Sequence, residues 1–521
     1  MRSRFNALRP RVVIVSAVAG LCILSSPQAR SAPQRKVNPQ PAPSPLIRTD
    51  TRLVEVEVVV RDKNGPVSGL TRDEFTLLDQ GKPQPIAVFN GGVAGQPGVV
   101  QARLSAPLPP GAVSNRMGRP GHSTSGATVL LLDQLNTSID NQGYSRGQLL
   151  KYLESVSGDE QIAIYLLGRS LSVVQDFTDN PETLREAVRK FDPKTLYVAI
   201  WNTENMDATD REMYGDNPVY RAIRNRITTE AVAKITQHLS GMPGRKSLVW
   251  LSDTPGNPGG QFLRAANIHL YPVLVRGVGG SGVFAWLRDI KEMGPIGAMA
   301  PPHMPIGNDL ARQHANAAVG AAGGGVGFMD SRDISTAVHT AVEDADTAYV
   351  LGFYPAEETL DNKFHVLTVN VGKKGAARGR ILEVRYRPGY VATRAGLGAP
   401  APASIEDVLR NPLNVTTIGI TAAPGFTDGK YQVTVTVDLH DIHFEMQNNR
   451  HAATLALSIA DDSSVQTETL KLSYTDAELA TALERGLILS KTLEQKSAVR
   501  IVARDAATGA VGSLWVPPSE K

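Results

Sequence analysis

The sequence predicts an α/β fold: a doubly wound, mostly parallel sheet flanked by β-rich units and followed by a carboxyl-terminal β-sandwich. Two apolar runs, at 128–133 and 246–253, share one plan in which a continuous apolar strand ends in an aspartate. Strands that are apolar throughout are typical of parallel sheets covered by helices on both faces. Helical and strand patterns alternate between the two runs, as they do in a parallel α/β sheet. Residues 431–437 and 453–459 instead alternate with a period of two, which indicates the sandwich.

The remaining elements of the α/β region follow from the spacing of apolar residues. The helix at 179–191 also carries the start signal Asn180-Pro181-Glu182, in which asparagine caps the helix and proline occupies its first turn. We expect 349–354 to be the last strand of the same sheet. Helical spacing predicts helices at 142–156, 179–191, 228–239 and 333–344, and apolar runs predict strands at 161–167, 268–275 and 349–354.

The amino-terminal segment 1–32 predicts a secretory signal. Four arginines precede an apolar stretch at 12–24, and small residues follow near Ser31 and Ala32, where cleavage is expected. The single cysteine, Cys22, lies inside that stretch, so the processed chain needs neither disulfides nor thiolate ligands. We expect an exported protein, periplasmic or extracellular. An uncleaved anchor, and with it contact with a membrane, remains the alternative.

Composition divides the rest of the chain into domains and linkers. Proline-rich and glycine-rich stretches mark the linkers. Segment 363–391 is expected to complete the amino-terminal β unit, because neither piece alone has enough core. The expected order is a proline-rich leader at 33–46, an amino-terminal β unit at 47–92, a linker at 93–126, the α/β domain at 127–356, a β-hairpin extension at 357–393 with strands at 364–371 and 380–387, a linker at 394–404 and the β-sandwich at 405–517.

Five further segments carry a resemblance to a known family. They lie at 56–65, 67–75, 79–82, 348–355 and 384–390. In this order, and together with the two acid-ended strands, they resemble the von Willebrand factor A-related group, exported bacterial proteins with a divergent A domain. The resemblance covers much of the chain after its signal and implies a von Willebrand factor A-like domain at 127–356.

The resemblance also implies a metal-ion-dependent adhesion site, which usually holds Mg²⁺. The family motif is Asp-x-Ser-x-Ser after the first strand, a threonine from a middle loop and an aspartate after a later strand. Asp133 matches the first acid, Thr137 replaces the second serine, and Asp253 matches the late aspartate. These three residues are the candidate metal ligands. In metal-bearing A domains an acidic side chain of the partner completes the coordination shell.

This chain departs from the motif at two points. The alternative to a magnesium site is therefore a degenerate site that binds no cofactor. Leu135 occupies the position of the first serine and offers no side-chain oxygen to a cation that prefers about six oxygen ligands. Asn136 is adjacent, but its side chain is expected to point elsewhere. The middle-loop threonine is not identified by a motif, and Thr195 and Thr203 are only positional candidates. Alternatively, the two aspartates cap helices or brace turns.

The resemblance favours a non-enzymatic, adhesion-type protein that recognises a protein partner. If no metal binds, we expect recognition to rely on the rim of loops at the edge of the sheet. Aromatic side chains are candidates for that rim, although each could equally be part of the core: Trp201, Tyr214, Trp250 and Trp286. Two alternatives stay open: a structural envelope protein without a specific ligand, and a metal-dependent hydrolase that uses the two aspartates. The sequence contains no Gly-x-Ser-x-Gly or His-Glu-x-x-His motif.

The charge balance argues against a nucleic-acid partner. The chain has 54 basic and 51 acidic residues, with a formal net charge of +3. Nucleic-acid-binding domains usually carry a dense basic stripe with interleaved aromatic residues, and the sequence has none.

Overall fold

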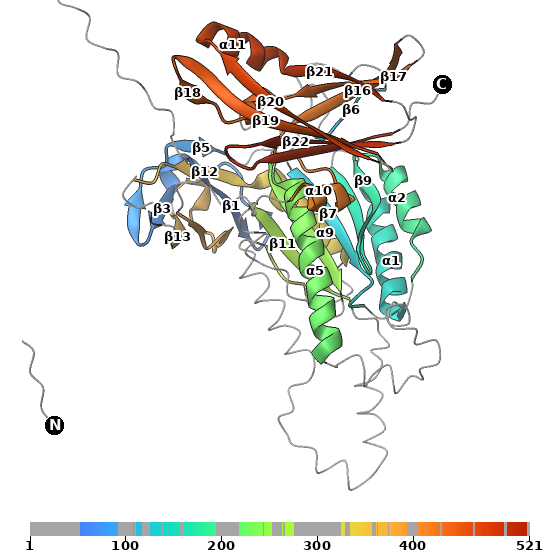
Figure 1. The fold of residues 1–521 in the computed structure, drawn as a ribbon. Helices are drawn as coiled ribbons and strands as arrows, with labels where there is room; N and C mark the ends of the chain where they lie inside the picture. Colours follow the sequence, from blue (N-terminus) through green and yellow to red (C-terminus); the bar gives the residue numbers. More distant parts are fainter. Residues whose placement is uncertain are drawn as a thin grey trace, which may run out of the picture. The chain divides into compact units, whose positions relative to one another are not determined.

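The structure is a computed structural model of the 521-residue chain, shown in Figure 1. The signal at 1–32 and the leader at 33–46 lie outside the described residues, so both stay predictions. No helix in the described part is both long and apolar enough to cross a membrane. The described residues are 53–91, 108, 111–116, 126–137, 139–156, 161–193, 218–242, 244–252, 263, 266–275, 325–328, 334–356, 361, 363–372, 375–392, 404–427, 430–461, 464–493 and 498–517.

The central sheet has the strand order β11-β10-β7-β8-β9. Neighbours among the first four strands run parallel, and β9 runs antiparallel to β8. All the β10 residues are buried, as expected of a strand with both faces covered. The strands are β7 (Gly126–Asp133), β8 (Ile162–Leu167), β9 (Leu171–Thr178), β10 (Arg245–Ser252) and β11 (Ile268–Leu274).

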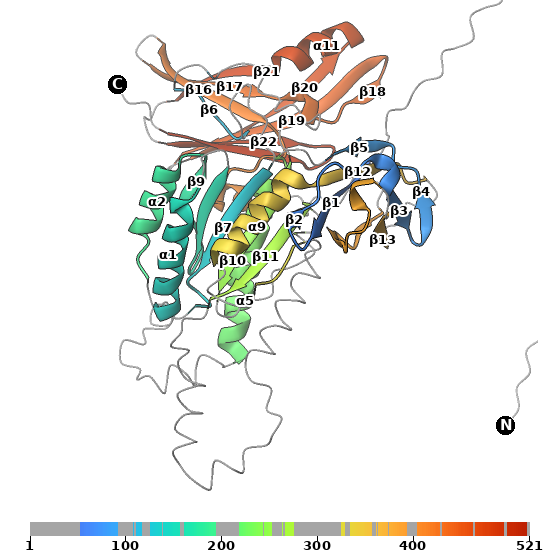
Figure 2. The ribbon, with the colours of Figure 1, turned by 180° about the vertical axis from the view of Figure 1, so that it is seen from behind.

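Helices pack on both faces of this sheet. Alternate residues of β7 enter two separate cores: Leu130 packs with α1 (Ile139–Glu154), α2 (Pro181–Lys190) and α9 (Ile334–Thr347), and Leu131 packs with α5 (Pro218–Leu239). Figure 2 shows α1, α2 and α9 in front of the sheet. Asn180 begins α2 as its N-cap, because its side chain accepts hydrogen bonds from the backbone N–H groups of residues 182 and 183.

The apolar strand at 349–354 does not belong to the central sheet, contrary to the expectation from sequence. β12 (Tyr349–Phe353) pairs antiparallel with β1 (Val54–Asp62) and β5 (Val88–Asn90). Their sheet has the order β14-β1-β12-β5, with β14 at Glu383–Tyr386, and β2 (Gly65–Pro66) pairs with β1. An apolar run specifies that a strand is buried, but many partners can bury it, so pattern alone did not identify the sheet.

A second amino-terminal sheet has the order β15-β13-β3-β4. The strands at 364–371 and 380–387 were expected to form a hairpin with each other, but β13 pairs with β3 and β15, and β14 pairs with β1. Segment 364–391 thus supplies strands to both sheets built from 54–90, and side chains from both stretches share one core. The strands are β3 (Phe75–Asp79), β4 (Lys82–Gln84), β13 (Phe364–Val371) and β15 (Gly389–Val391), and the short helices are η1 (Arg72–Glu74) and η5 (Gly375–Ala377).

A buried ionic cluster joins β1 to the amino ends of β10 and β11. The Glu57 carboxylate accepts hydrogen bonds from His269 Nε2 at 2.9 Å, from Asn267 Nδ2 at 2.8 Å and from Arg245 Nη1 at 3.5 Å. Glu57, Arg245 and His269 are each less than 9% exposed. Burial and, to a smaller extent, the adjacent Arg245 lower the pKa of His269 to about 4, so the imidazole is neutral near pH 7.

Two sheets enclose the carboxyl-terminal core, in the orders β21-β17-β16-β6 and β18-β19-β22-β23, with β20 paired to β19. The strands are β16 (Ile420–Thr427), β17 (Lys430–Val437), β18 (Glu445–Gln447), β19 (Arg450–Ala460), β20 (Val465–Tyr474), β21 (Leu487–Leu493), β22 (Val499–Asp505) and β23 (Val511–Val516). The helices are α10 (Ile405–Arg410), η6 (Leu439–Asp441) and α11 (Asp476–Arg485).

One strand of these sheets comes from the segment expected to be a linker. β6 (Val113–Ser114) pairs antiparallel with β16, Ser114 opposite Thr421. The next residue, Asn115, is 4% exposed; its Nδ2 donates to Val415 O and Ile418 O, and its Oδ1 accepts from Ile420 N. Part of segment 93–126 is therefore built into the carboxyl-terminal core.

Candidate functional site

Asp133 ends β7 at the carboxyl edge of the central sheet. Its neighbour on β8 is Leu167, and the preceding residue of β7 lies beside Leu251 of β10. The backbone N–H groups of Gln134 and Leu135 both donate to Leu167 O, at 2.9 and 3.1 Å, so the chain turns across the end of β8. This turn leaves the Asp133 side chain buried, with 3% of its surface exposed.

Both oxygens of the Asp133 carboxylate accept hydrogen bonds from N–H groups of the protein. Oδ1 accepts from Asn136 N at 2.9 Å and from Asn136 Nδ2 at 3.1 Å. Oδ2 accepts from Asn136 Nδ2 at 2.9 Å and from Trp250 Nε1 at 3.0 Å. The expectation that Asn136 points elsewhere was wrong, because a three-residue turn folds its amide back onto the carboxylate.

The environment of Asp133 favours its neutral form more than water does. Burial raises the pKa of Asp133 to about 6, while the hydrogen bonds from Asn136 and Trp250 act in the opposite direction by stabilising the carboxylate. The group is still mostly ionised at neutral pH. The N–H donors of Asn136 and Trp250 already occupy acceptor positions on both oxygens, where a cation would bind.

Leu135 and Thr137 lie in the turn that follows Asp133. The Leu135 side chain is 3% exposed and packs in the core beneath the sheet, so a buried apolar side chain stands where the family motif has a serine. Thr137 is 4% exposed, and its backbone oxygen accepts a hydrogen bond from Gln142 Nε2 at 2.8 Å. The structure therefore brings Asp133 and Thr137 into one turn.

The other predicted site residues are placed less completely. Asp253 follows directly after β10, but it lies outside the described residues, as do Thr195 and Thr203. Within the described ranges, no three His, Cys, Asp or Glu side chains are grouped so as to hold a metal ion.

Trp250 is a core residue and not part of a rim. Its side chain is fully buried among the residues beneath the sheet, and its indole N–H reaches Asp133. Sequence reasoning missed this contact, although the plan shared by the two acid-ended strands could have indicated that β7 and β10 are neighbours. The remaining aromatic candidates, Trp201, Tyr214 and Trp286, lie outside the described residues.

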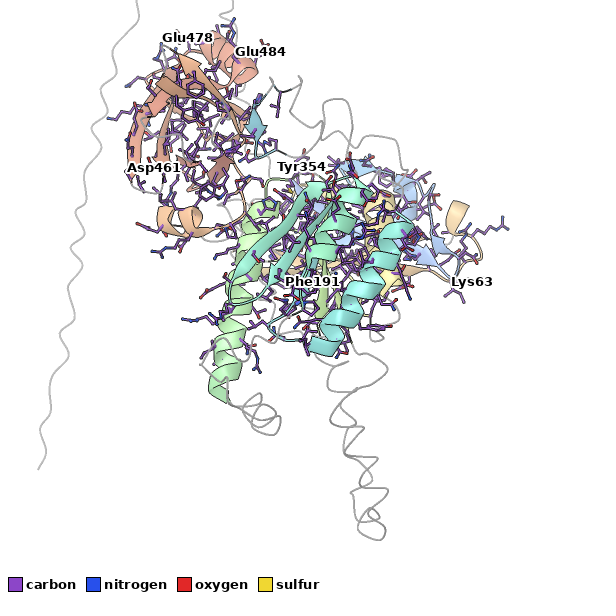
Figure 3. All side chains as sticks on the ribbon, turned by 90° about the vertical axis from the view of Figure 1, so that its right-hand side faces the viewer. Lys63, Phe191, Tyr354, Asp461, Glu478 and Glu484 are labelled. Carbon is purple, nitrogen blue, oxygen red and sulfur yellow. The ribbon has the colours of Figure 1, made fainter. Side chains whose placement is uncertain are left out.

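Two helices reach the same edge of the sheet. Thr228 on α5 lies beside the turn, with Oγ1 at 3.5 Å from Asn136 Nδ2. Gln134 Nε2 donates to Asp192 O at 3.0 Å, which places the end of α2 at this edge as well. Phe191, labelled in Figure 3, caps α2 and is 5% exposed. The edge therefore combines Asp133 with the points where α2 ends and α5 passes.

No family model matches the chain, and no curated protein matches it. Among solved structures, the conserved hypothetical protein BatB from Bacteroides thetaiotaomicron is 9% identical over 29% of this chain and 66% of that protein, with a TM-score of 0.20. Two structures of proximal thread matrix protein 1 from the mussel byssus are 10% identical over 29% of this chain and 38% or 37% of theirs, with a TM-score of 0.17. The matched region spans less than two thirds of each of these proteins.

Proposed function

We propose that this chain is an exported, non-enzymatic binding protein with a von Willebrand factor A-like domain, and that it recognises a protein partner at the carboxyl edge of its central sheet. We further propose that recognition needs no cation at Asp133. The observation that carries the proposal is that α2 and β11 both end at the edge where Asp133 lies, and that long stretches of chain follow each of them.

The first connection has 27 residues, because α2 ends at Lys190 and α5 begins at Pro218. The second has 50 residues, because β11 ends at Leu274 and the chain is described again from Gly325, where Phe328 bridges Val273 of β11. Both start at the carboxyl edge. Connections in compact domains typically have about 4–6 residues, and much longer ones are usually functional or serve as linkers. Binding residues concentrate on such segments, which a rigid sheet positions.

The chemistry around Asp133 supports recognition without a metal. Magnesium prefers close to six oxygen ligands in octahedral geometry. Asp133 instead has its oxygens bonded to Asn136 and Trp250, and Leu135 contributes only carbon. A carboxylate used in this way fixes the turn between β7 and α1 from which the edge is built. Asp133 thus supports the binding surface without contacting the partner.

Capture from an envelope extract, with and without chelator, tests the proposal. Two variants replace residues 194–216 or 276–323 with a short glycine-serine linker, and each must first show the unfolding transition of the wild type. We expect partner capture that resists chelator in the wild type and is lost in at least one variant. A control variant, Glu478→Ala with Glu484→Ala, alters only exposed side chains of α11, labelled in Figure 3, and should capture normally.

Three outcomes contradict specific parts of the proposal. Capture that chelator abolishes, and that magnesium restores, would show that recognition depends on a cation. Capture that survives both replacements would place the binding surface elsewhere. Hydrolysis of a partner by the purified protein would contradict the non-enzymatic assignment.

A further inference from the structure

Arg500 is a buried cation in the carboxyl-terminal sheets. It lies near the start of β22, opposite Trp515 on β23, and 1% of its surface is exposed. Its neighbours in sequence, Val499 and Ile501, face the core between the two sheets. Because side chains alternate along a strand, Arg500 faces the other side, beneath the segment that follows α10.

The guanidinium group is held in place on two sides. Nη2 donates to Leu413 O at 2.6 Å and to Ser513 Oγ at 2.7 Å. The Trp515 ring lies against the guanidinium, with Cζ at 4.9 Å from the ring centroid, within the range of a cation–π contact. These contacts prevent the side chain from reaching solvent without breaking hydrogen bonds.

The other two nitrogens of Arg500, Nε and Nη1, are buried and have no hydrogen-bond partner in the described part of the chain. Arg500 also makes no salt bridge with a described carboxylate, in contrast to Arg245, which is buried beside Glu57. Burial lowers the pKa of Arg500 to about 9, so the group remains charged at neutral pH. A buried charge without a counter-charge is strongly unfavourable, and most buried N–H groups have partners.

We propose that the unpaired N–H groups of Arg500 bind a small monovalent anion of the size of chloride. An anion supplies both the missing acceptor and the missing negative charge, whereas a water molecule supplies only the acceptor. The enclosed position of the guanidinium favours a small ion over an organic carboxylate. This site does not depend on the proposed binding function.

Occupancy should strengthen the attachment of the carboxyl-terminal sheets to the central domain. The Leu413 carbonyl accepts from Arg500, while the Leu413 side chain packs in the core of the central domain. A ligand that binds only the folded state stabilises it in proportion to the logarithm of its concentration above the dissociation constant. Chloride should therefore raise the Tm of the wild-type chain.

Thermal unfolding in sodium chloride and in sodium gluconate of the same ionic strength tests this site. We expect Tm to be several degrees higher in chloride than in gluconate, with a rise that follows the logarithm of the chloride concentration, and no such difference in Arg500→Met. The matched control is Arg450→Met, because Arg450 is exposed and paired with Glu478, and it should keep the full chloride effect. An equal chloride effect in Arg500→Met would overturn the proposal.

Bromide gives a second measurement that needs no variant. Crystals of the wild type grown in sodium bromide should show an anomalous peak within hydrogen-bonding distance of Arg500 Nε or Nη1. Well-ordered density for Arg500 without such a peak would overturn the proposal even if Arg500→Met fails to fold. Bromide at Arg500 combined with the same Tm in chloride as in gluconate would show an adventitious ion only.

Discussion

Trp250 Nε1 donates a hydrogen bond to Asp133 Oδ2 at 3.0 Å, from β10 to the end of the neighbouring β7. Both residues are nearly or fully buried, at 0% and 3% exposure. The bond ties together the two strands whose acid-ended sequences predicted the central sheet. The carboxylate that a metal would need is therefore part of the packing of the sheet.

Removing the Asp133 carboxylate should destabilise the fold. Asp133→Ala leaves the buried Trp250 N–H without an acceptor, and unsatisfied buried donors cost about 1–3 kcal/mol each. We expect a loss of about 2–4 kcal/mol in the free energy of unfolding, measured with urea. Asp73→Ala, at an exposed position, should change it by less than about 0.5 kcal/mol. An Asp133→Ala variant as stable as the wild type would contradict this role.

Restoring the missing serine should not create a magnesium site. Leu135→Ser adds an oxygen at the position of the family's first serine, but Leu135 packs in the core and Asn136 still donates to the carboxylate. We expect a loss of about 3 kcal/mol or more in stability, from the cavity and the buried hydroxyl. Calorimetric titration with magnesium should give no saturable heat in the wild type or in Leu135→Ser. Tight binding by either protein would show that Asn136 yields to the cation.

Asp133 should also give the fold a characteristic pH dependence. Its pKa rises from 3.8 to about 6 on folding, so between these values the folded chain keeps a proton that the unfolded chain releases. Stability from this group is thus greatest at low pH and falls as pH rises through that window, by on the order of 3 kcal/mol. Urea unfolding of the wild type and of Asp133→Asn, from about pH 4 to pH 8, measures this pH dependence of stability. The difference in unfolding free energy between the two proteins should change between about pH 4 and pH 6 and become constant above about pH 7. Parallel profiles throughout would contradict a raised pKa.

Breaking the ionic cluster around Glu57 should also lower the free energy of unfolding, because it leaves a buried charge less well compensated. Glu57→Ala removes a carboxylate that the buried Arg245 contacts, and removal of one member of a buried ion pair costs about 3–5 kcal/mol. We expect a loss of that order in urea unfolding. Glu484→Ala, at an exposed position on α11, is the control and should be close to neutral. A small effect of Glu57→Ala would mean that water enters the cluster and screens the arginine.

Local elements were more predictable than their partners. The apolar run at 128–133 and the helix start at Asn180 correspond to β7 and α2, because burial and capping are written in adjacent residues. The pairing of β12 with β1 depends on residues that are about 295 positions apart in the chain, and no local pattern encodes it. Val54 pairs with Phe353, for example, and Val58 pairs with Tyr349. A strand of two residues such as β6 has no periodicity to detect.

The candidate site shows the same limit. Asp133 was identifiable because an acid at the end of an apolar strand is poorly explained by packing. The return of the Asn136 amide to Asp133 depends on the turn that two hydrogen bonds to Leu167 O impose, which motif spacing does not contain. The contact with Trp250 depends on strand order in the same way.

The pairing of Ser114 with Thr421 sets an order of assembly. The two residues are 307 positions apart, and every residue of the central domain lies between them in the chain. As the chain leaves the ribosome, β6 emerges long before β16 and must wait unpaired until nearly the whole protein has been made. Closing so large a loop is slow, and waiting strands are open to aggregation. A chain that stops before Ile420 cannot complete this sheet. We therefore expect β6 to need protection by chaperones until β16 has been synthesised.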